Sequence, residues 1–248
     1  MNTIRSATCT VCFYVWSIFM GLLMIPMVLL PRRAFRLFVL LWAAGNSLIF
    51  RVVVGIRVEI RGREYIPVGS AIVASKHQSE WETNIFLRLL TDPVYIMKKE
   101  LGYIPGYGLY ARKMNMIFID RSGYAKTLRK LVIDTRKIVE SGRAVVIFPE
   151  GTRVDPGKKL PYRPGIAALY NNLDLPVVPV VHNSGLFWPK KSFRKYAGTI
   201  VLQFLPPIEL GLPRQEFMTR LEREMEQAAD KLMAETYKSQ KNINGTLT

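Results

Sequence analysis

A histidine and two carboxylates follow directly after a short apolar run. The run, residues 71–74, has the composition of a buried strand, and His77, Glu80 and Glu82 come just after it. Open α/β sheets usually carry their chemistry at such places, outside the carboxyl end of a strand. A turn that leads into a helix at Trp81 can bring a carboxylate back within hydrogen-bond reach of the imidazole. The spacing therefore predicts a histidine base with a carboxylate partner. The alternative is a surface histidine beside a solvated acidic cluster.

Two further apolar runs end in loops that carry an arginine. Residues 116–119 are followed by Asp120 and Arg121, and residues 144–148 are followed after Pro149 by Glu150, Gly151, Thr152 and Arg153. In a parallel sheet the carboxyl ends of the strands share one edge, so these loops can converge on the histidine. The planar fork of arginine suits a phosphate, glycine allows close approach to the backbone, and threonine adds a hydroxyl donor. The pattern indicates a cleft with a base and two phosphate-binding arginines; ordinary surface arginines are the alternative.

The elements that must position these residues begin near residue 52, where short apolar runs start to alternate with amphipathic stretches. The expected strands are 52–60, 71–75, 94–97, 116–119, 144–148, 177–181 and 199–205. The expected helices are 81–90, 104–113, 122–141, 165–173 and 213–238. This alternation is typical of an α/β domain with a mostly parallel mixed sheet flanked by helices. We therefore expect an α/β domain over 52–238, followed by a disordered tail over 239–248.

The N-terminal residues 1–51 form a different kind of segment. Residues 11–30 carry no charge and are long enough to cross a bilayer core, whereas the second apolar stretch, 37–50, is short for a full span. Between them lies a basic cluster of Arg32, Arg33 and Arg36. We expect a membrane-associated segment of two helices. A hairpin that dips into one leaflet, with the arginines near phosphates, and a transmembrane helix followed by an interfacial one fit the sequence equally well.

Composition narrows the choice of partners. The 248 residues include 35 Lys and Arg against 19 Asp and Glu, for a net charge of +16, and 49% are hydrophobic. Such a charge implies an anionic partner. Because the basic residues are scattered and the chain is apolar, a membrane surface is favoured over nucleic acid, for which no recognition motif is present. Cys9 and Cys12 have no second pair to complete a metal site or a disulfide framework, so no metal is expected.

Four blocks of the chain resemble the glycerolipid acyltransferase family, and most closely its bacterial 1-acylglycerol-3-phosphate acyltransferases. They are His77 to Glu82, Phe118 to Arg121, the Phe-Pro-Glu-Gly-Thr-Arg block at 148–153, and residues 175–180. The resemblance implies that His77 is the catalytic base and Glu82 its partner, and that Arg121 and Arg153 hold the acceptor phosphate. It also implies that Glu150, Gly151 and Thr152 shape that pocket, and that residues 177–180 lie near the acyl donor. The sequence departs from the family pattern at two positions. The family usually has aspartate where this chain has Glu82, and asparagine is common before the histidine, where this chain has Lys76.

The resemblance further implies a reaction and a location. An acyl chain would pass from acyl-CoA or acyl carrier protein to the free hydroxyl of lysophosphatidic acid, giving phosphatidic acid without a cofactor, at the cytoplasmic face of the bacterial inner membrane. The absence of a Gly-x-Ser-x-Gly elbow favours direct transfer over a covalent acyl-enzyme. Glycerol-3-phosphate or another lysolipid, such as a lyso-ornithine lipid, is the alternative acceptor. A non-catalytic basic membrane-binding protein is the alternative of another class.

Overall fold

The computed structural model describes residues 2–120 and 124–245, and in this part of the chain seven strands form one sheet in the order β1-β7-β6-β2-β5-β3-β4. Neighbouring strands from β6 to β4 are parallel, and β7 is antiparallel to β6 while β1 is parallel to β7. The mostly parallel mixed sheet is thus confirmed. The strands are β1 (Ile56–Arg61), β2 (Ile72–Ser75), β3 (Val94–Lys98), β4 (Ile117–Ile119), β5 (Val145–Ile147), β6 (Val177–His182) and β7 (Gly198–Phe204).

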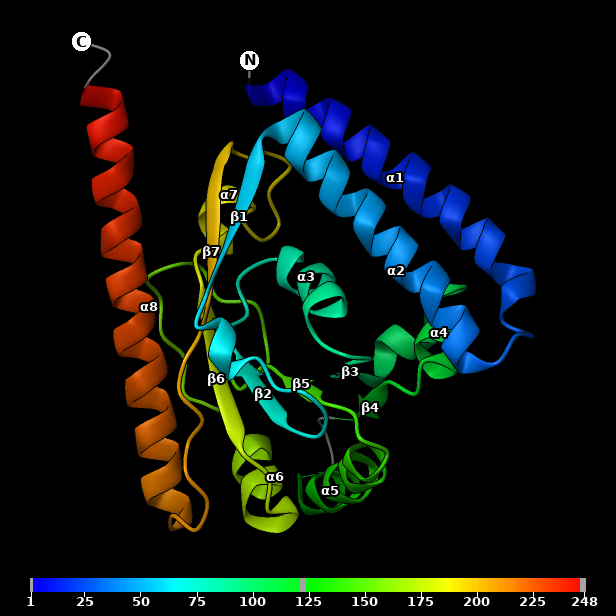
Figure 1. Cartoon of the computed structure of the whole chain (residues 1–248), viewed down its shortest axis with the longest axis vertical. Coiled ribbons are helices and arrows are strands. Elements are labelled where there is room, and N and C mark those ends of the chain that lie inside the picture. The colour runs from blue at the N-terminus through cyan, green and yellow to red at the C-terminus, as the bar shows by residue number, and fades with distance from the viewer. Residues whose placement is uncertain (1, 121–123, 246–248) are drawn as a thin grey trace.

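Helices cover both faces of the sheet because its central strands are apolar on both sides. The α-helices are α1 (Asn2–Met27), α2 (Arg32–Ile49), α3 (Trp81–Leu89), α4 (Tyr107–Lys113), α5 (Tyr124–Glu140), α6 (Gly165–Leu173), α7 (Ser184–Phe187) and α8 (Arg214–Gly245). Alternate residues of one strand serve different cores: Ile72 packs with α5, α6 and α8, whereas Val73 packs with α3 and α2. Figure 1 shows α8 on one side of the sheet and α1, α2 and α3 on the other.

The apolar N-terminal segment is a helical hairpin, longer in its second arm than expected. A π-helical turn, Phe50–Val54, continues α2 to Gly55, whose φ of 88° ends it. The prediction of a strand from residue 52 is therefore wrong up to Val54, and strand geometry begins at Ile56. By length and composition, Thr3–Met27 and Arg32–Val54 are both apolar enough to cross a membrane.

The hairpin lies along the domain and turns an apolar face outward. Near its start, Ser6 bonds the backbone of Lys195, and in its middle the carbonyl of Gly21 accepts the hydroxyl of Tyr110. At the start of α2, Arg32 and Arg36 pair with Asp92 of the domain. Large apolar side chains are exposed at helical spacing along one face of α1, at Ile4, Val11, Val15, Ile18, Leu22 and Ile25.

The C-terminal helix α8 runs from Arg214 to Gly245. It therefore extends past Lys238 and occupies, as far as Gly245, the segment in which we expected disorder. Its apolar residues Phe217, Leu221, Met225 and Leu232 are buried on the sheet, as the sequence pattern predicts. This packing brings Glu226 of the same helix toward the carboxyl ends of the strands.

Candidate active site

The loops after β2 and β5 leave the sheet side by side because these strands are parallel neighbours. Ala74 is in register with Ile147, so His77 and Glu150, each three residues further on, emerge together. The backbone N–H of His77 donates to Oε2 of Glu150 at 2.9 Å, and the carbonyl of His77 accepts from the N–H of Val154 at 2.7 Å. The loop after β5 thus fixes the backbone on both sides of the histidine.

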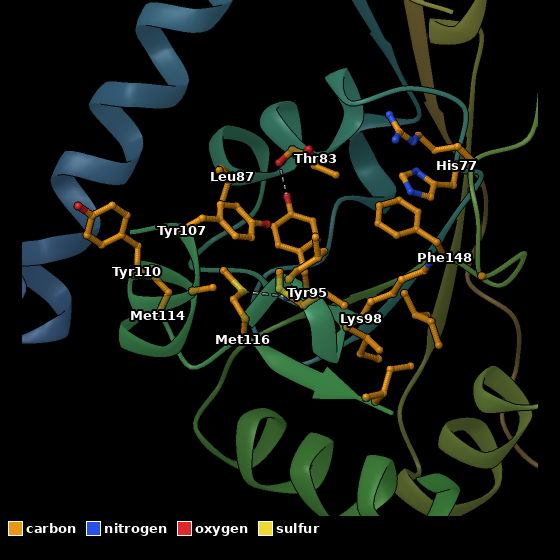
Figure 2. Close-up of a pocket in the computed structure, with 18 of the residues that line it drawn as sticks. His77, Thr83, Leu87, Tyr95, Lys98, Tyr107, Tyr110, Met114, Met116 and Phe148 are labelled. Atoms are coloured by element: carbon orange, nitrogen blue, oxygen red, sulfur yellow. Dashed lines mark hydrogen bonds between the residues drawn. The ribbon is translucent and has the colours of Figure 1, made fainter. Parts of the chain in front are cut away.

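The imidazole of His77 is held by Glu82 and not by Glu80. Nδ1 of His77 lies 2.8 Å from Oε1 of Glu82, and the side chains are 19% and 0% exposed, respectively. A carboxylate at Nδ1 favours the tautomer in which Nδ1 carries the proton, which leaves the lone pair on Nε2. Phe148 stacks on the imidazole with ring centroids 4.1 Å apart, and Figure 2 shows both rings at the edge of a cavity.

Glu82 lies in a buried site built entirely of hydrogen-bond donors. Its Oε1 accepts from the backbone N–H groups of Gln78 and Ser79, both at 2.9 Å. Its Oε2 accepts from the hydroxyls of Ser79 at 2.9 Å and Ser184 at 3.2 Å. Burial by itself raises the pKa of Glu82, but the neighbouring histidines and the donated hydrogen bonds outweigh it and lower the pKa to about 2. Glu82 is therefore ionised at neutral pH.

Lys76, the residue before the histidine, points into the protein beneath the site. Its buried ammonium contacts Glu150 and, at 2.7 Å, Oε1 of Glu226 on α8. The hydroxyl of Tyr162 donates to the same oxygen of Glu226 at 3.0 Å. Burial raises the pKa of Glu150, against the opposing charge of Lys76. Glu150 is absent from the cavity wall; it acts on the site through the backbone of His77.

The rest of the Phe-Pro-Glu-Gly-Thr-Arg loop forms the rim of the site. Gly151 adopts a φ of 71°, which only glycine takes at no steric cost, and it lets the chain turn so that Thr152 and Arg153 line the cavity. The guanidinium of Arg153 pairs with Glu80. Arg121 was predicted to join this rim, but it lies outside the residues that the structure describes.

The cavity beside His77 has a volume of about 1130 Å³ and reaches from the strand ends to the N-terminal hairpin. Its far wall includes Ile18, Leu22 and Ile25 of α1, and its middle is lined by aromatic and methionine side chains, among them Tyr95, Tyr107, Tyr110, Met114 and Met116 (Figure 2). The hydroxyl of Tyr95 is satisfied by the carbonyl of Thr83 at 2.7 Å, which leaves its ring as an apolar surface. Ligand sites are typically about 300–1,000 Å³, so this cavity is large enough for a long apolar chain.

Comparison with known proteins identifies the family of this chain. Residues 57–183 match the protein-family model described as Acyltransferase. The chain belongs to this family. It is 36% identical over 218 residues to the 1-acyl-sn-glycerol-3-phosphate acyltransferase of Pseudomonas aeruginosa, covering 87% of this chain and 84% of that one. It is 30% identical over 203 residues to the human 1-acyl-sn-glycerol-3-phosphate acyltransferase alpha, covering 78% and 69%.

The crystal structure of the 1-acyl-sn-glycerophosphate (LPA) acyltransferase PlsC from Thermotoga maritima has the same fold. It superposes with a TM-score of 0.76 at 24% identity, covering 94% of this chain and 98% of that one. The predicted enzyme class and fold are therefore confirmed. The roles of individual residues stay predictions.

Several residues of this acyltransferase site were missed from the sequence. The backbone N–H and the hydroxyl of Ser79 both donate to the carboxylate of Glu82 at the start of α3, and the Ser79 hydroxyl accepts from the N–H of Trp81. The Ser-x-x-Glu spacing of a capping box was a local signal for this arrangement. Ser184 and Glu226 had no such signal, because they lie 102 and 150 residues from the side chains they contact.

Metal-ligating side chains do not cluster at this site. Over residues 2–120 and 124–245, no three His, Cys, Asp or Glu side chains are placed to hold an ion. The other histidine, His182, is buried, with Nδ1 3.0 Å from the hydroxyl of Ser184. Burial lowers the pKa of His182, which favours its neutral form. The expectation of catalysis without a cofactor stays a prediction.

Proposed function

We propose that the protein transfers an acyl chain from an acyl thioester to the free hydroxyl of 1-acylglycerol-3-phosphate, giving phosphatidic acid. The observation that carries this proposal is the imidazole of His77, oriented by a buried, ionised Glu82, on the wall of a long apolar cavity whose rim holds Arg153. A base, an apolar chain site and a phosphate-binding cation are the three parts that this reaction needs. The matched relatives, which are named for this reaction, support the same acceptor.

In the proposed reaction, Nε2 of His77 takes the proton of the acceptor hydroxyl while the hydroxyl oxygen attacks the thioester carbonyl carbon. The tetrahedral intermediate collapses, the C–S bond breaks, and the imidazolium returns its proton to the departing sulfur. Glu82 keeps Nδ1 protonated and stabilises the imidazolium, the role an acid plays in a hydrolase triad. No protein nucleophile is needed, and the new ester bond forms in one transfer.

The acceptor phosphate would be held by Arg153, and by Arg121 as the resemblance implies, with Gly151 and Thr152 shaping that subsite. Both acyl-CoA and acyl carrier protein are acidic and suit a chain of net charge +16. Glycerol-3-phosphate and other lysolipids remain competing acceptors. The contact of the cavity with exposed apolar residues of α1 favours a lipid that stays in the bilayer.

We propose that the hairpin lies in one leaflet instead of spanning the membrane. A helix that crosses a bilayer contacts a domain on one side of the membrane only near one end. In contrast, α1 contacts the domain near its start, at Ser6, and again in its last third, at Gly21. The outward apolar stripe of α1 is the expected face for an interfacial helix. Because thioester donors are made in the cytoplasm, the cytoplasmic face of the inner membrane is the proposed location.

The deciding experiment measures thiol release from an acyl-thioester by detergent-solubilised protein with lysophosphatidate, with glycerol-3-phosphate and with no acceptor. We expect release that requires lysophosphatidate and falls about 10²–10⁴-fold in His77→Ala, the range of a general base. Release without an acceptor would indicate a thioesterase. If a folded, membrane-bound protein gives no His77-dependent release with any pairing of donor and acceptor, the proposal fails. That result would favour a non-catalytic, basic membrane-binding protein.

A further inference from the structure

A second pocket, of about 300 Å³, lies on the other side of Arg153 from the large cavity, between α1 and the segment 188–195. We name it the α1 pocket. Thr10, Phe13 and Tyr14 of α1 form one wall, and the segment 188–195 forms the other. Arg153 lines both this pocket and the cavity that contains His77, so the two spaces meet at its side chain. The α1 pocket therefore lies between the reaction site and the membrane-facing helix.

The α1 pocket contains a buried cation that no carboxylate neutralises. Lys195 is only 7% exposed and lines the pocket, yet none of the ion pairs among the described residues involves it. Its ammonium makes long contacts to the hydroxyl of Thr10 at 3.3 Å and the carbonyl of Phe193 at 3.5 Å, and lies 4.8 Å from the ring centroid of Trp188. Buried charges are normally paired, and burial lowers the pKa of this lysine. An anion in the pocket would offset that cost.

The position of Lys195 is fixed independently of any ligand. Its backbone N–H donates to the hydroxyl of Ser6 at 2.9 Å, which holds the segment 188–195 against α1. Its ammonium makes a cation–π contact with the ring of Trp188. A methionine at this position keeps the apolar stem and the backbone bonds but removes the charge, so the charge can be tested apart from the fold.

Two acidic groups lie near Lys195, the thiol of Cys9 and the carboxylate of Glu80. Burial raises the pKa of Cys9 to about 11, so its thiol is neutral at neutral pH, and Glu80 is already paired with Arg153. Glu80, Arg153, Lys191 and Lys195 all line the pocket. Three cations against one carboxylate leave the pocket positively charged. Lys191 also adopts a φ of 55°, which is uncommon for a residue with a side chain.

We propose that the α1 pocket binds a phosphate group, with Lys195 and Arg153 as its two principal cations. The inference rests on the proposed function and deepens it, because it places a phosphate group of one of the two substrates on the α1 side of the site. The same phosphate chemistry occurs in the acceptor lipid and in the nucleotide part of an acyl-CoA donor. Measuring KM separately for the acceptor and for the donor distinguishes these two sources.

The binding test does not depend on catalysis. Inorganic phosphate is titrated into the detergent-solubilised protein at constant ionic strength while tryptophan emission is followed, since a ligand that draws Lys195 away alters the surroundings of Trp188. We expect a saturable change that disappears in Trp188→Phe, which assigns the signal. In Lys195→Met we expect the dissociation constant to rise about tenfold or more, as for loss of a charge-assisted bond, and in Lys195→Arg we expect recovery. Lys130→Met, which removes an exposed lysine of α5, is the matched control.

The kinetic test assigns the source of the phosphate. KM is measured for lysophosphatidate and for acyl-CoA in Lys195→Met, Lys195→Arg and Lys130→Met. A rise of about tenfold in KM for lysophosphatidate, with kcat little changed, identifies the acceptor phosphate; a rise for acyl-CoA alone identifies the donor. Either result supports the pocket. If phosphate titrates the wild type and Lys195→Met identically, the proposal is overturned, and this holds whether or not the protein transfers acyl groups.

Discussion

Glu80 and Glu82 stand two residues apart at the start of α3 and have opposite surroundings. The side chain of Glu82 is completely buried and accepts hydrogen bonds from His77, backbone N–H groups and two serines. The side chain of Glu80 is 59% exposed and its described partner is Arg153 on the rim. In the proposed reaction, Glu82 belongs to the part of the site that moves a proton. Glu80 holds Arg153 at the surface, where the proposed substrate phosphate would bind it.

The contrast separates two requirements of the proposed reaction. A base must keep one tautomer and one orientation, so its partner is held by many short bonds that solvent does not reach. A phosphate-binding arginine must exchange partners, so it is held by an exposed ion pair, which is typically worth only about 0–1 kcal/mol. Substitutions that neutralise each carboxylate should therefore have very different consequences.

The largest effect is expected from Glu82→Gln. The amide keeps the size of the side chain but places an NH₂ group among N–H donors and no longer stabilises an imidazolium. Loss of the equivalent acid in a hydrolase triad costs about 10⁴ in kcat, and we expect kcat here to fall about 10²–10⁴-fold with little change in KM. Steady-state kinetics beside far-ultraviolet circular dichroism checks this. A folded variant with kcat within tenfold of wild type would remove Glu82 from the mechanism.

A second contrast concerns two lysines that reach α8. Lys76 bonds Glu226 and Lys159 bonds Asp230, both at 2.7 Å, but the first pair is buried and the second is exposed. Lys76→Met leaves Glu150 and Glu226 buried without their cation, so we expect a loss of about 3–5 kcal/mol in the free energy of unfolding. Lys159→Met should cost about 0–1 kcal/mol.

Urea denaturation of both lysine variants in the same detergent measures these costs. Equal losses for the two would mean that burial does not govern the Lys76 network. A large loss in Lys76→Met that is partly relieved by adding Glu226→Gln would show that the excess buried negative charge is its cause.

The titration of Glu82 should make the free energy of unfolding depend on pH. Its pKa is about 2 in the folded protein against an ordinary value of 4.5. Because the folded pKa is the lower one, the stabilisation is complete above pH 4.5 and is lost as the pH falls toward 2, by about 3 kcal/mol in total. Glu82→Gln lacks this titration, so the difference in unfolding free energy between the wild type and this variant should shrink between pH 4.5 and 2. A difference that is constant with pH would contradict the assignment.

The sequence could predict the parts of the site whose residues lie close together in the chain. His77 and Glu82 are joined by one turn. The apolar runs before His77 and before the Phe-Pro-Glu-Gly-Thr-Arg block predicted two strands, which the sheet pairs in parallel. Residues 52–54 misled the prediction, because a run of valines has strand propensity but here completes α2 against the domain. Tertiary packing overrides such propensity.

The features that the sequence could not reveal depend on contacts between distant segments. No residue close to Lys76 in the sequence indicates that its ammonium pairs with Glu226. No residue close to Thr10 indicates that Lys195 contacts α1 there. The large cavity likewise has walls from α1, α3, α4 and the strand ends together. Its volume is a property of the assembled fold and of no single motif.

The smallest expected effect is that of Glu80→Gln, and its direction is opposite to that of Glu82→Gln. The substitution frees Arg153 from an exposed ion pair worth about 0.2–1 kcal/mol, so a phosphate-bearing acceptor no longer has to displace a carboxylate. We expect KM for lysophosphatidate to fall about 1.5–5-fold with kcat unchanged, measured at low and at high salt. Because salt screens the pair in the wild type, the two proteins should converge as salt rises. A higher KM in Glu80→Gln would mean that Glu80 positions Arg153 for the substrate, and the rim would then be as preorganised as the buried pair.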